Sequence, residues 1–70
     1  MDKRINRNAL AAKMPVAWMS MPEIQAKLDI PGELYTDLCD AVTELVACGR
    51  AEHGRVTQGL YEWSEFRRKS

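Results

Sequence analysis

Apolar and polar residues recur with a helical period in the middle of the chain, from about Glu33 to Ala47 or Cys48. One side of this segment is apolar, with Tyr35 and Val46 at its edge, and consists of Leu34, Leu38, Ala41, Val42 and Leu45. The opposite side is polar and mostly acidic, and consists of Glu33, Thr36, Asp37, Asp40, Thr43 and Glu44. Residues three and four apart share one face of an α-helix, so this pattern predicts an amphipathic helix. Gly49 and Arg50 then suit its C-terminal end.

Two shorter helices are predicted before this segment. The first runs from about Asn6 to Met14 and ends at Pro15, because proline disfavours the helical state in the residue before it. The second begins at Ser20, where Ser20-Met21-Pro22-Glu23 fits the S-x-x-E capping box. Pro31 prevents this helix from continuing, which predicts a turn between the second and third helices.

The C-terminal third predicts a β-hairpin. Its strands run from Arg50 to His53 and from Leu60 to Trp63, and the loop Arg55–Gln58 lies between Gly54 and Gly59. Tyr61 and Trp63 share one strand face, and we expect them to close over the helices. The predicted core is then Trp18, Ile24, Leu28, Leu38, Val42, Leu45, Tyr61 and Trp63. The tail from Ser64 to Ser70 is polar except for Phe66, which predicts frayed chain or a short helix.

Length and composition predict one globular domain over residues 1–70, with a basic N-terminal arm at about 1–5 and a polar tail at about 64–70. Seventy residues lie near the lower limit for a chain that folds alone. A hydrophobic share of 46% is ordinary for a globular protein, which argues against wholesale disorder. Neither a signal peptide nor an apolar run of membrane-spanning length is visible, so we expect a cytoplasmic protein with no membrane partner.

The formal net charge is zero, but the charges are unevenly distributed. Residues 1–13 hold four Lys or Arg against one Asp (+3), and residues 14–49 hold one Lys against six Asp or Glu (−5). Residues 50–70 hold five Lys or Arg against three Glu (+2). This distribution suits either phosphate contact by the two ends or an acidic face that meets a basic partner.

Catalytic chemistry is not indicated, and we predict neither an enzyme nor a cofactor. His53 is the single histidine, and no nucleophile and base pair is recognisable beside it. Cys39 and Cys48 lie nine residues apart on one predicted helix, on opposite sides, so they cannot bridge each other. Two cysteines and one histidine also fall short of a four-ligand zinc site. Small buried thiols are the simplest interpretation, and an intermolecular disulfide or a redox role is the alternative.

Three segments carry a resemblance to a known family. They are M-S-M-P-E-I from Met19, L-x-x-A-V-x-x-L-V-x-x-G-R from Leu38, and the stretch from Gly54 to Trp63. With the order of predicted elements, they make the chain resemble the winged helix-turn-helix superfamily, as found in small bacterial and phage regulators. The resemblance covers about Ile5 to Trp63. It implies an α+β fold, a small winged helix-turn-helix of three helices followed by a two-stranded β-hairpin wing.

The resemblance implies a DNA-binding protein similar to transcriptional regulators, with double-stranded DNA as its partner. In such domains the second helix of the turn motif lies in the major groove, and the wing meets the backbone. Carried onto this chain, that helix would present Glu33, Thr36, Asp37 and Asp40 to the bases. The predicted DNA-binding residues, from the arm, the second helix, the third helix and the wing, are Arg4, Arg7, Lys27, Thr36, Arg55, Thr57 and Gln58.

The acidic side of the third helix predicts an alternative function. Most specific base contacts come from Arg, Lys, Asn or Gln, and carboxylates near phosphates repel them. A protein–protein interaction module that does not bind DNA would use this side against a basic partner. Its predicted contact residues are Glu33, Asp37, Asp40 and Glu44. The sequence leaves the oligomeric state open, a homodimer included.

Overall fold

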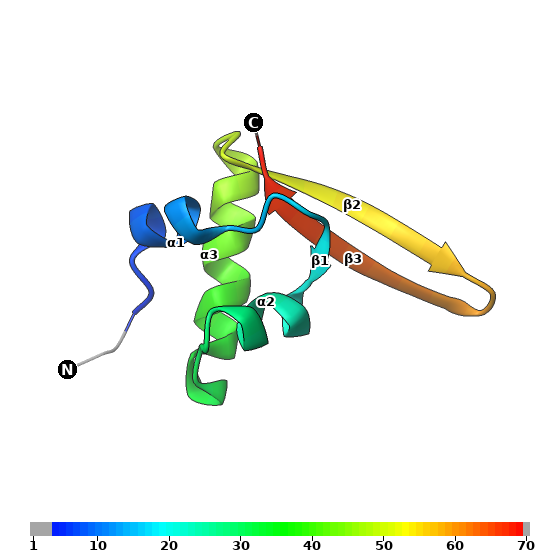
Figure 1. Cartoon of the computed structure of the whole chain (residues 1–70), viewed down its shortest axis with the longest axis horizontal. Coiled ribbons are helices and arrows are strands. Elements are labelled where there is room, and N and C mark those ends of the chain that lie inside the picture. The colour runs from blue at the N-terminus through cyan, green and yellow to red at the C-terminus, as the bar shows by residue number, and fades with distance from the viewer. Residues whose placement is uncertain (1–3, 70) are drawn as a thin grey trace.

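The computed structural model describes residues 4–69, so the first three residues of the predicted arm and the last residue of the tail lie outside it. These residues form an α+β fold in which three α-helices pack together and a long hairpin projects from them (Figure 1). The elements in chain order are α1 (Arg7–Lys13), β1 (Met19–Ser20), α2 (Met21–Lys27), the 3-10 turn η1 (Gly32–Leu34), α3 (Tyr35–Ala47), β2 (Ala51–Gln58) and β3 (Tyr61–Arg68). Across the described range, no helix combines the length and apolar character needed to cross a membrane.

The sheet is antiparallel and has three strands within the described range, in the order β1-β3-β2. The predicted wing of two strands is therefore corrected, because Met19 and Ser20 of β1 pair with Phe66 and Glu65 of β3. Strands β2 and β3 pair along their whole length, from Ala51 opposite Arg68 to Gln58 opposite Tyr61.

The hairpin is longer than predicted. The predicted loop Arg55–Gln58 belongs to β2, and the predicted frayed tail from Ser64 onward continues β3 as far as Arg68. The turn lies instead at Gly59 and Leu60, where Gly59 has a φ of 61°, a conformation that glycine adopts readily. Gly54 is a strand residue for a different reason. A Cβ atom added there would lie 3.0 Å from the Trp18 ring, so the glycine admits the close approach of that ring.

The core is built from the helices and the base of the hairpin. Its buried residues are Leu10, Ala11, Met14, Ile24, Leu38, Ala41, Val42, Leu45 and Ala51. The predicted burial of Ile24, Leu38, Val42 and Leu45 is confirmed, and Leu28 packs against this core while remaining partly exposed.

The predicted burial of three aromatic residues is wrong. Trp18 is 39% exposed, Trp63 is 36% exposed and Tyr61 is 76% exposed. For Tyr61 and Trp63 the cause is the period of two along β3, because Phe66 packs against the core and these two residues therefore lie on the other face of the strand. The sequence pattern ended the strand at Trp63 and so assigned the wrong face to the core.

The predicted helix ends are confirmed except at the start of the third helix, which begins at Tyr35 rather than at Glu33 because Gly32–Leu34 form the 3-10 turn η1. The Asn6 side chain accepts a hydrogen bond from the Ala9 N–H at 3.0 Å and caps α1. The Glu23 carboxylate accepts from the Ser20 N–H at 3.2 Å and from the Ser20 hydroxyl at 2.9 Å, which lowers the pKa of Glu23. Gly49 follows α3 with a φ of 81°, as its predicted role at the helix end requires.

Leu38→Ala is expected to lower the free energy of unfolding by about 2–5 kcal/mol, because it removes buried methyl groups and leaves a cavity. Leu60→Ala is the matched control, since Leu60 is 99% exposed. This control is expected to change stability by less than about 0.5 kcal/mol. Urea unfolding of both variants measures the difference. Equal stabilities would contradict the burial of the Leu38 side of α3 in the core.

Candidate nucleic-acid interface

A hollow of about 270 Å³ separates α3 from the hairpin and is lined by Thr43, Val46, His53, Ser64 and Phe66. We call it the α3–hairpin hollow. His53 and Phe66 are cross-strand partners whose rings stack with their centroids 5.0 Å apart, which fixes the floor of the hollow on the hairpin side. No carboxylate is among these lining residues.

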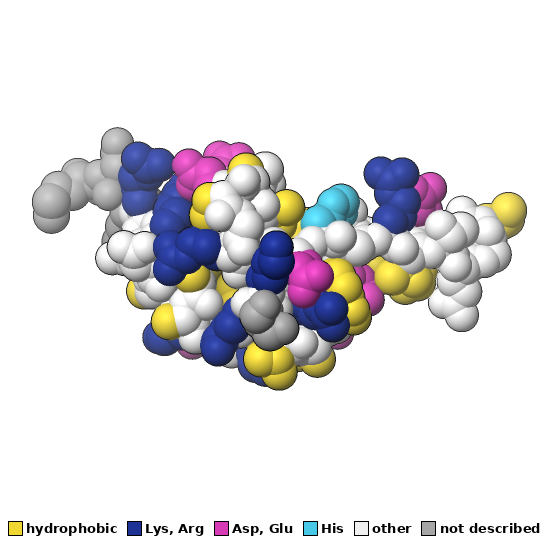
Figure 2. Space-filling view, turned by 90° about the horizontal axis from the view of Figure 1, so that it is seen from above, with side chains coloured by type: hydrophobic (Ala, Val, Ile, Leu, Met, Phe, Trp, Pro, Cys, Tyr) yellow, Lys and Arg dark blue, Asp and Glu magenta, His cyan; other side chains and the backbone are white. Residues whose placement is uncertain are grey.

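The hairpin face that lines the α3–hairpin hollow continues beyond the hollow toward the turn. Arg55 and Thr57 lie on the strand face of His53, because side chains alternate along β2. Arg55 Nε lies 2.9 Å from Glu62 Oε1, and the Arg55 side chain is 69% exposed. Exposed ion pairs contribute little stability, so Arg55 can exchange Glu62 for a phosphate. Near the middle of the projecting hairpin, basic and acidic side chains lie on one side, and hydrophobic side chains lie on the other with acidic ones beside them (Figure 2).

Arg7 holds together two carboxylates of α3. Its Nη1 and Nη2 donate to Asp37 Oδ2 at 3.0 Å and to Asp37 Oδ1 at 3.1 Å, and its Nε donates to Glu44 Oε2 at 2.5 Å. The Ile5 N–H also donates to Asp37 Oδ2 at 2.7 Å. The bonds from Arg7, and then that from Ile5, lower the pKa of Asp37, and the two carboxylates raise the pKa of Arg7. We call these contacts the Arg7 network.

The Arg7 network joins residues that the sequence analysis assigned to two separate sites. Arg7 was predicted to contact DNA, whereas in the structure it binds Asp37 and Glu44 of the predicted protein-binding set. Glu33 and Asp40 are exposed, and no ion pair joins them to another side chain between residues 4 and 69.

The remaining predicted DNA-binding residues are exposed on several elements rather than gathered in one cluster. Arg4 precedes α1, Lys27 ends α2, and Thr36 lies in the first turn of α3. Thr57 and Gln58 lie at the end of β2, beside the turn. Gln58 lies on the opposite strand face from Thr57, so only Thr57 shares a side with Arg55.

The other face of the hairpin carries Val56 and Trp63 beside charged residues, and the sequence analysis missed this grouping. A hollow of about 220 Å³ is lined there by Trp18, Gly54, Arg55, Val56 and Glu65. The Arg67 guanidinium lies 4.5 Å from the centre of the Trp18 ring, and its Nε lies 3.1 Å from Glu52 Oε1. The sequence signal that could have revealed this face is the period of two along the strands. Once β2 is extended through the predicted loop, it places Val56 opposite Trp63 on one face.

The two cysteines are free thiols. Both were predicted to be buried. Cys39 is half-buried, whereas Cys48 is exposed, so the prediction is wrong for Cys48. Cys48 follows the last turn of α3, where its Sγ lies 3.4 Å from the Leu45 carbonyl oxygen rather than in the core. Within residues 4–69, no group of three or more His, Cys, Asp or Glu residues is placed to hold a metal ion.

The chain matches no protein-family model, no curated protein and no solved structure. Two features distinguish the surface of α3: the carboxylate-free α3–hairpin hollow and, on another side of the helix, the Arg7 network.

The Arg7 network is expected to make stability depend on pH below about pH 5. The folded-state pKa of Asp37 is lowered, so its contribution is present above the unfolded pKa of about 3.9 and is lost as pH falls through the folded value. Asp37→Asn should therefore be less stable than the parent at pH 7, and this difference should shrink toward pH 2. Urea unfolding across that range measures it, with Asp40→Asn as the control. A difference between parent and Asp37→Asn that is the same at every pH would contradict the assignment.

Proposed function

We propose that this chain is a winged-helix DNA-binding protein of the transcriptional-regulator type, and that its contact surface is the hairpin side of α3. The order α1-β1-α2-α3-β2-β3 and the sheet order β1-β3-β2 support a helix-turn-helix followed by a wing. The observation that carries the proposal is the Arg7 network, because it pairs two carboxylates of α3 with a cation and so weakens their repulsion of DNA.

The geometry of α3 explains why these carboxylates do not oppose the proposal. Successive helical residues turn by about 100°, so Asp37 and Glu44, seven apart, share one side of α3. Contact with Arg7 makes this the α1 side. Thr43 and Val46 line the α3–hairpin hollow, so the side toward the hairpin is neutral. A helix with this division offers uncharged side chains and a hydroxyl to DNA, while Asp37 and Glu44 are paired on another side.

The proposed affinity comes from few phosphate contacts. Arg55 and Thr57 lie on the hairpin face that continues the hollow, and Thr36 adds a hydroxyl in the first turn of α3. Arg and Thr side chains commonly bind phosphate oxygens. One phosphate contact by Arg55 would give a slope of log K against log salt of about −0.9. We therefore expect weak binding to the DNA backbone, with any preference for sequence coming from the surface of α3.

Arg55→Gln is expected to weaken binding to mixed-sequence duplex DNA and to make the salt slope less negative by about 0.9, the loss of one phosphate contact. Arg67→Gln is the matched control, because Arg67 is on the opposite face of the same hairpin, bound to Glu52 and Trp18. Fluorescence anisotropy over a series of salt concentrations measures both. Equal losses in the two variants would contradict binding through the Arg55 face.

A second candidate function is binding of a basic protein by the acidic outer surface of α3. Two of the four predicted carboxylates are available for it, because Glu33 and Asp40 are exposed and form no ion pair between residues 4 and 69. Asp37 and Glu44 are bound to Arg7 and would have to exchange that partner. This candidate therefore rests on two exposed charges.

The double variant Glu33→Lys/Asp40→Lys separates the two candidates. If α3 faces DNA, the variant should bind duplex DNA more tightly than the parent, most visibly at low salt, because two repulsive charges become attractive. If α3 binds a basic protein, the complex should be lost while DNA binding is absent in both forms. The Arg7 network is untouched, so a normal melting temperature is the control for folding. No change in either binding assay would remove α3 from both candidates.

A further inference from the structure

A third hollow lies at the end of the hairpin remote from its turn. Its volume is about 380 Å³, at the lower end of the roughly 300–1,000 Å³ typical of small-ligand pockets. Its walls come from α1, from the connection between α3 and β2, and from the end of β3. Its charged lining residues are Arg50, Arg68 and Lys69, and no carboxylate is among the lining residues. We call it the basic hollow.

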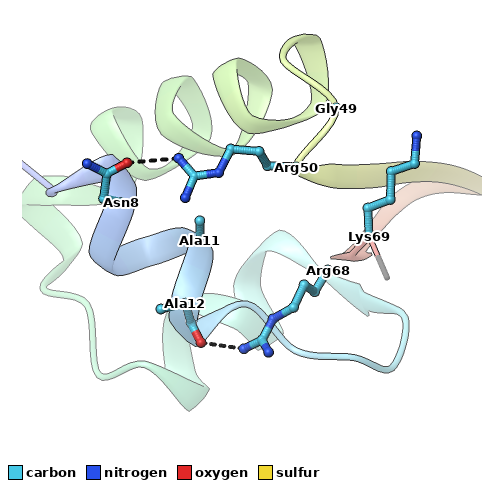
Figure 3. Close-up of a pocket in the computed structure, with 7 residues that line it drawn as sticks. All are labelled: Asn8, Ala11, Ala12, Gly49, Arg50, Arg68 and Lys69. Carbon is cyan, nitrogen blue, oxygen red and sulfur yellow. Dashed lines mark hydrogen bonds between the residues drawn. The ribbon is translucent and has the colours of Figure 1, made fainter.

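The two arginines of the basic hollow are held in place by α1. Arg50 Nη1 donates to Asn8 Oδ1 at 2.8 Å, and Arg68 Nη2 donates to the Ala12 carbonyl oxygen. Figure 3 shows both guanidiniums reaching toward α1, whereas the Lys69 side chain points away from it. The backbone is fixed as well, since the Arg68 N–H donates to the Pro15 carbonyl oxygen at 2.7 Å. The positions of Arg50 and Arg68 are therefore fixed by hydrogen bonds to α1 and to the segment that follows it.

Arg68 also carries an unsatisfied donor. Its Nε is buried, and no hydrogen-bond acceptor is placed against it within the described part of the chain. Native structures pair nearly all buried polar atoms, so an unpaired donor calls for an explanation. Because the Nε is buried, an anion in the hollow does not reach it in this arrangement. Like charges in one hollow also repel one another, and a bound anion would relieve that repulsion. The gathering of three cations without a carboxylate therefore points to a ligand with several anionic oxygens.

We propose that the basic hollow binds the phosphate group of a small molecule. Guanidinium groups match the tetrahedral oxygens of phosphate through paired, charge-assisted hydrogen bonds, and a lysine adds a point charge at the rim. The site is separate from the proposed DNA surface, because Ala51 and Arg68 pair at the base of the hairpin and Gln58 and Tyr61 pair beside its turn. Bound phosphate would join α1 to the start of β2 and the end of β3.

Helix capping is the simpler role for these cations, since basic groups stabilise helix C-termini. It accounts for the bond from Arg68 to the Ala12 carbonyl near the end of α1. It also accounts for the position of Arg50 just after the C-terminus of α3. It does not account for the bond from Arg50 to Asn8 in the first turn of α1, or for the exposed Lys69. A capping role would change stability without any response to phosphate, so the two roles give different results.

The test is a titration of the 15N-labelled protein with inorganic phosphate in a constant chloride background, followed by amide chemical shifts. The expected result is saturable shifts centred on Gly49, Arg50 and Lys69, and a melting temperature that rises with phosphate concentration. Lys69→Gln and Arg50→Gln should each weaken the binding by at least about tenfold, the loss of one charge-assisted contact. Lys69 is exposed, so its variant keeps the fold even if the Arg50 variant does not.

Two controls make the result specific. Arg67→Gln removes one positive charge outside the hollow and should bind phosphate like the parent, as should Arg55→Gln from the proposed DNA surface. Shifts that do not saturate, or that spread equally over Lys27 and Arg55, would overturn the proposal. Displacement of phosphate by duplex DNA would assign the hollow to backbone phosphates and would overturn the separate small-ligand site. Loss of DNA binding in Arg55→Gln with normal phosphate binding would leave it standing.

Discussion

Phe66 is the residue on which the arrangement of the hairpin depends. It pairs with Met19 of β1 and with His53 of β2, and its side chain packs against the helical core. Because strand side chains alternate, this one contact decides which face of the hairpin meets α3 along its whole length. If both strands of the hairpin shifted by one residue relative to the core, Arg67 would face the core in place of Phe66. Val56 would then replace Arg55 and Thr57 on the side of the α3–hairpin hollow, and the proposed DNA surface would be lost.

The sequence specified the helices more completely than the strands. Helix positions were predictable because their signals are local, as with the capping box at Ser20 and the glycine at Gly49. The hairpin was predicted, but its length was not, because Gly54 is compatible with either a turn or a strand. What decides between them is the Trp18 ring, 36 residues away in sequence, which occupies the space of a side chain at Gly54. Contacts over such a separation leave no periodic signal.

The charge pattern shows the same limit at the candidate sites. The sequence correctly located basic residues near both ends and acidic residues in the middle, but it treated them as separate surfaces. In the fold, Arg7 crosses to α3 and binds Asp37 and Glu44, while Arg50, Arg68 and Lys69 gather around a hollow without carboxylates. Strand pairing brings Ala51 opposite Arg68, so the second cluster follows from the register of the hairpin rather than from any run of charges.

The sheet order has a consequence for how firmly the hairpin is held. Strand β1 covers β3 only at Glu65 and Phe66, so the part of the hairpin from Val56 to Trp63 is a ribbon of two strands. Two-stranded ribbons are marginally stable alone, and amides there open without global unfolding. Hydrogen exchange should accordingly be slowest beside Phe66 and fastest near Gly59. Any contact that holds the two strands of this ribbon together would therefore also reduce its local opening.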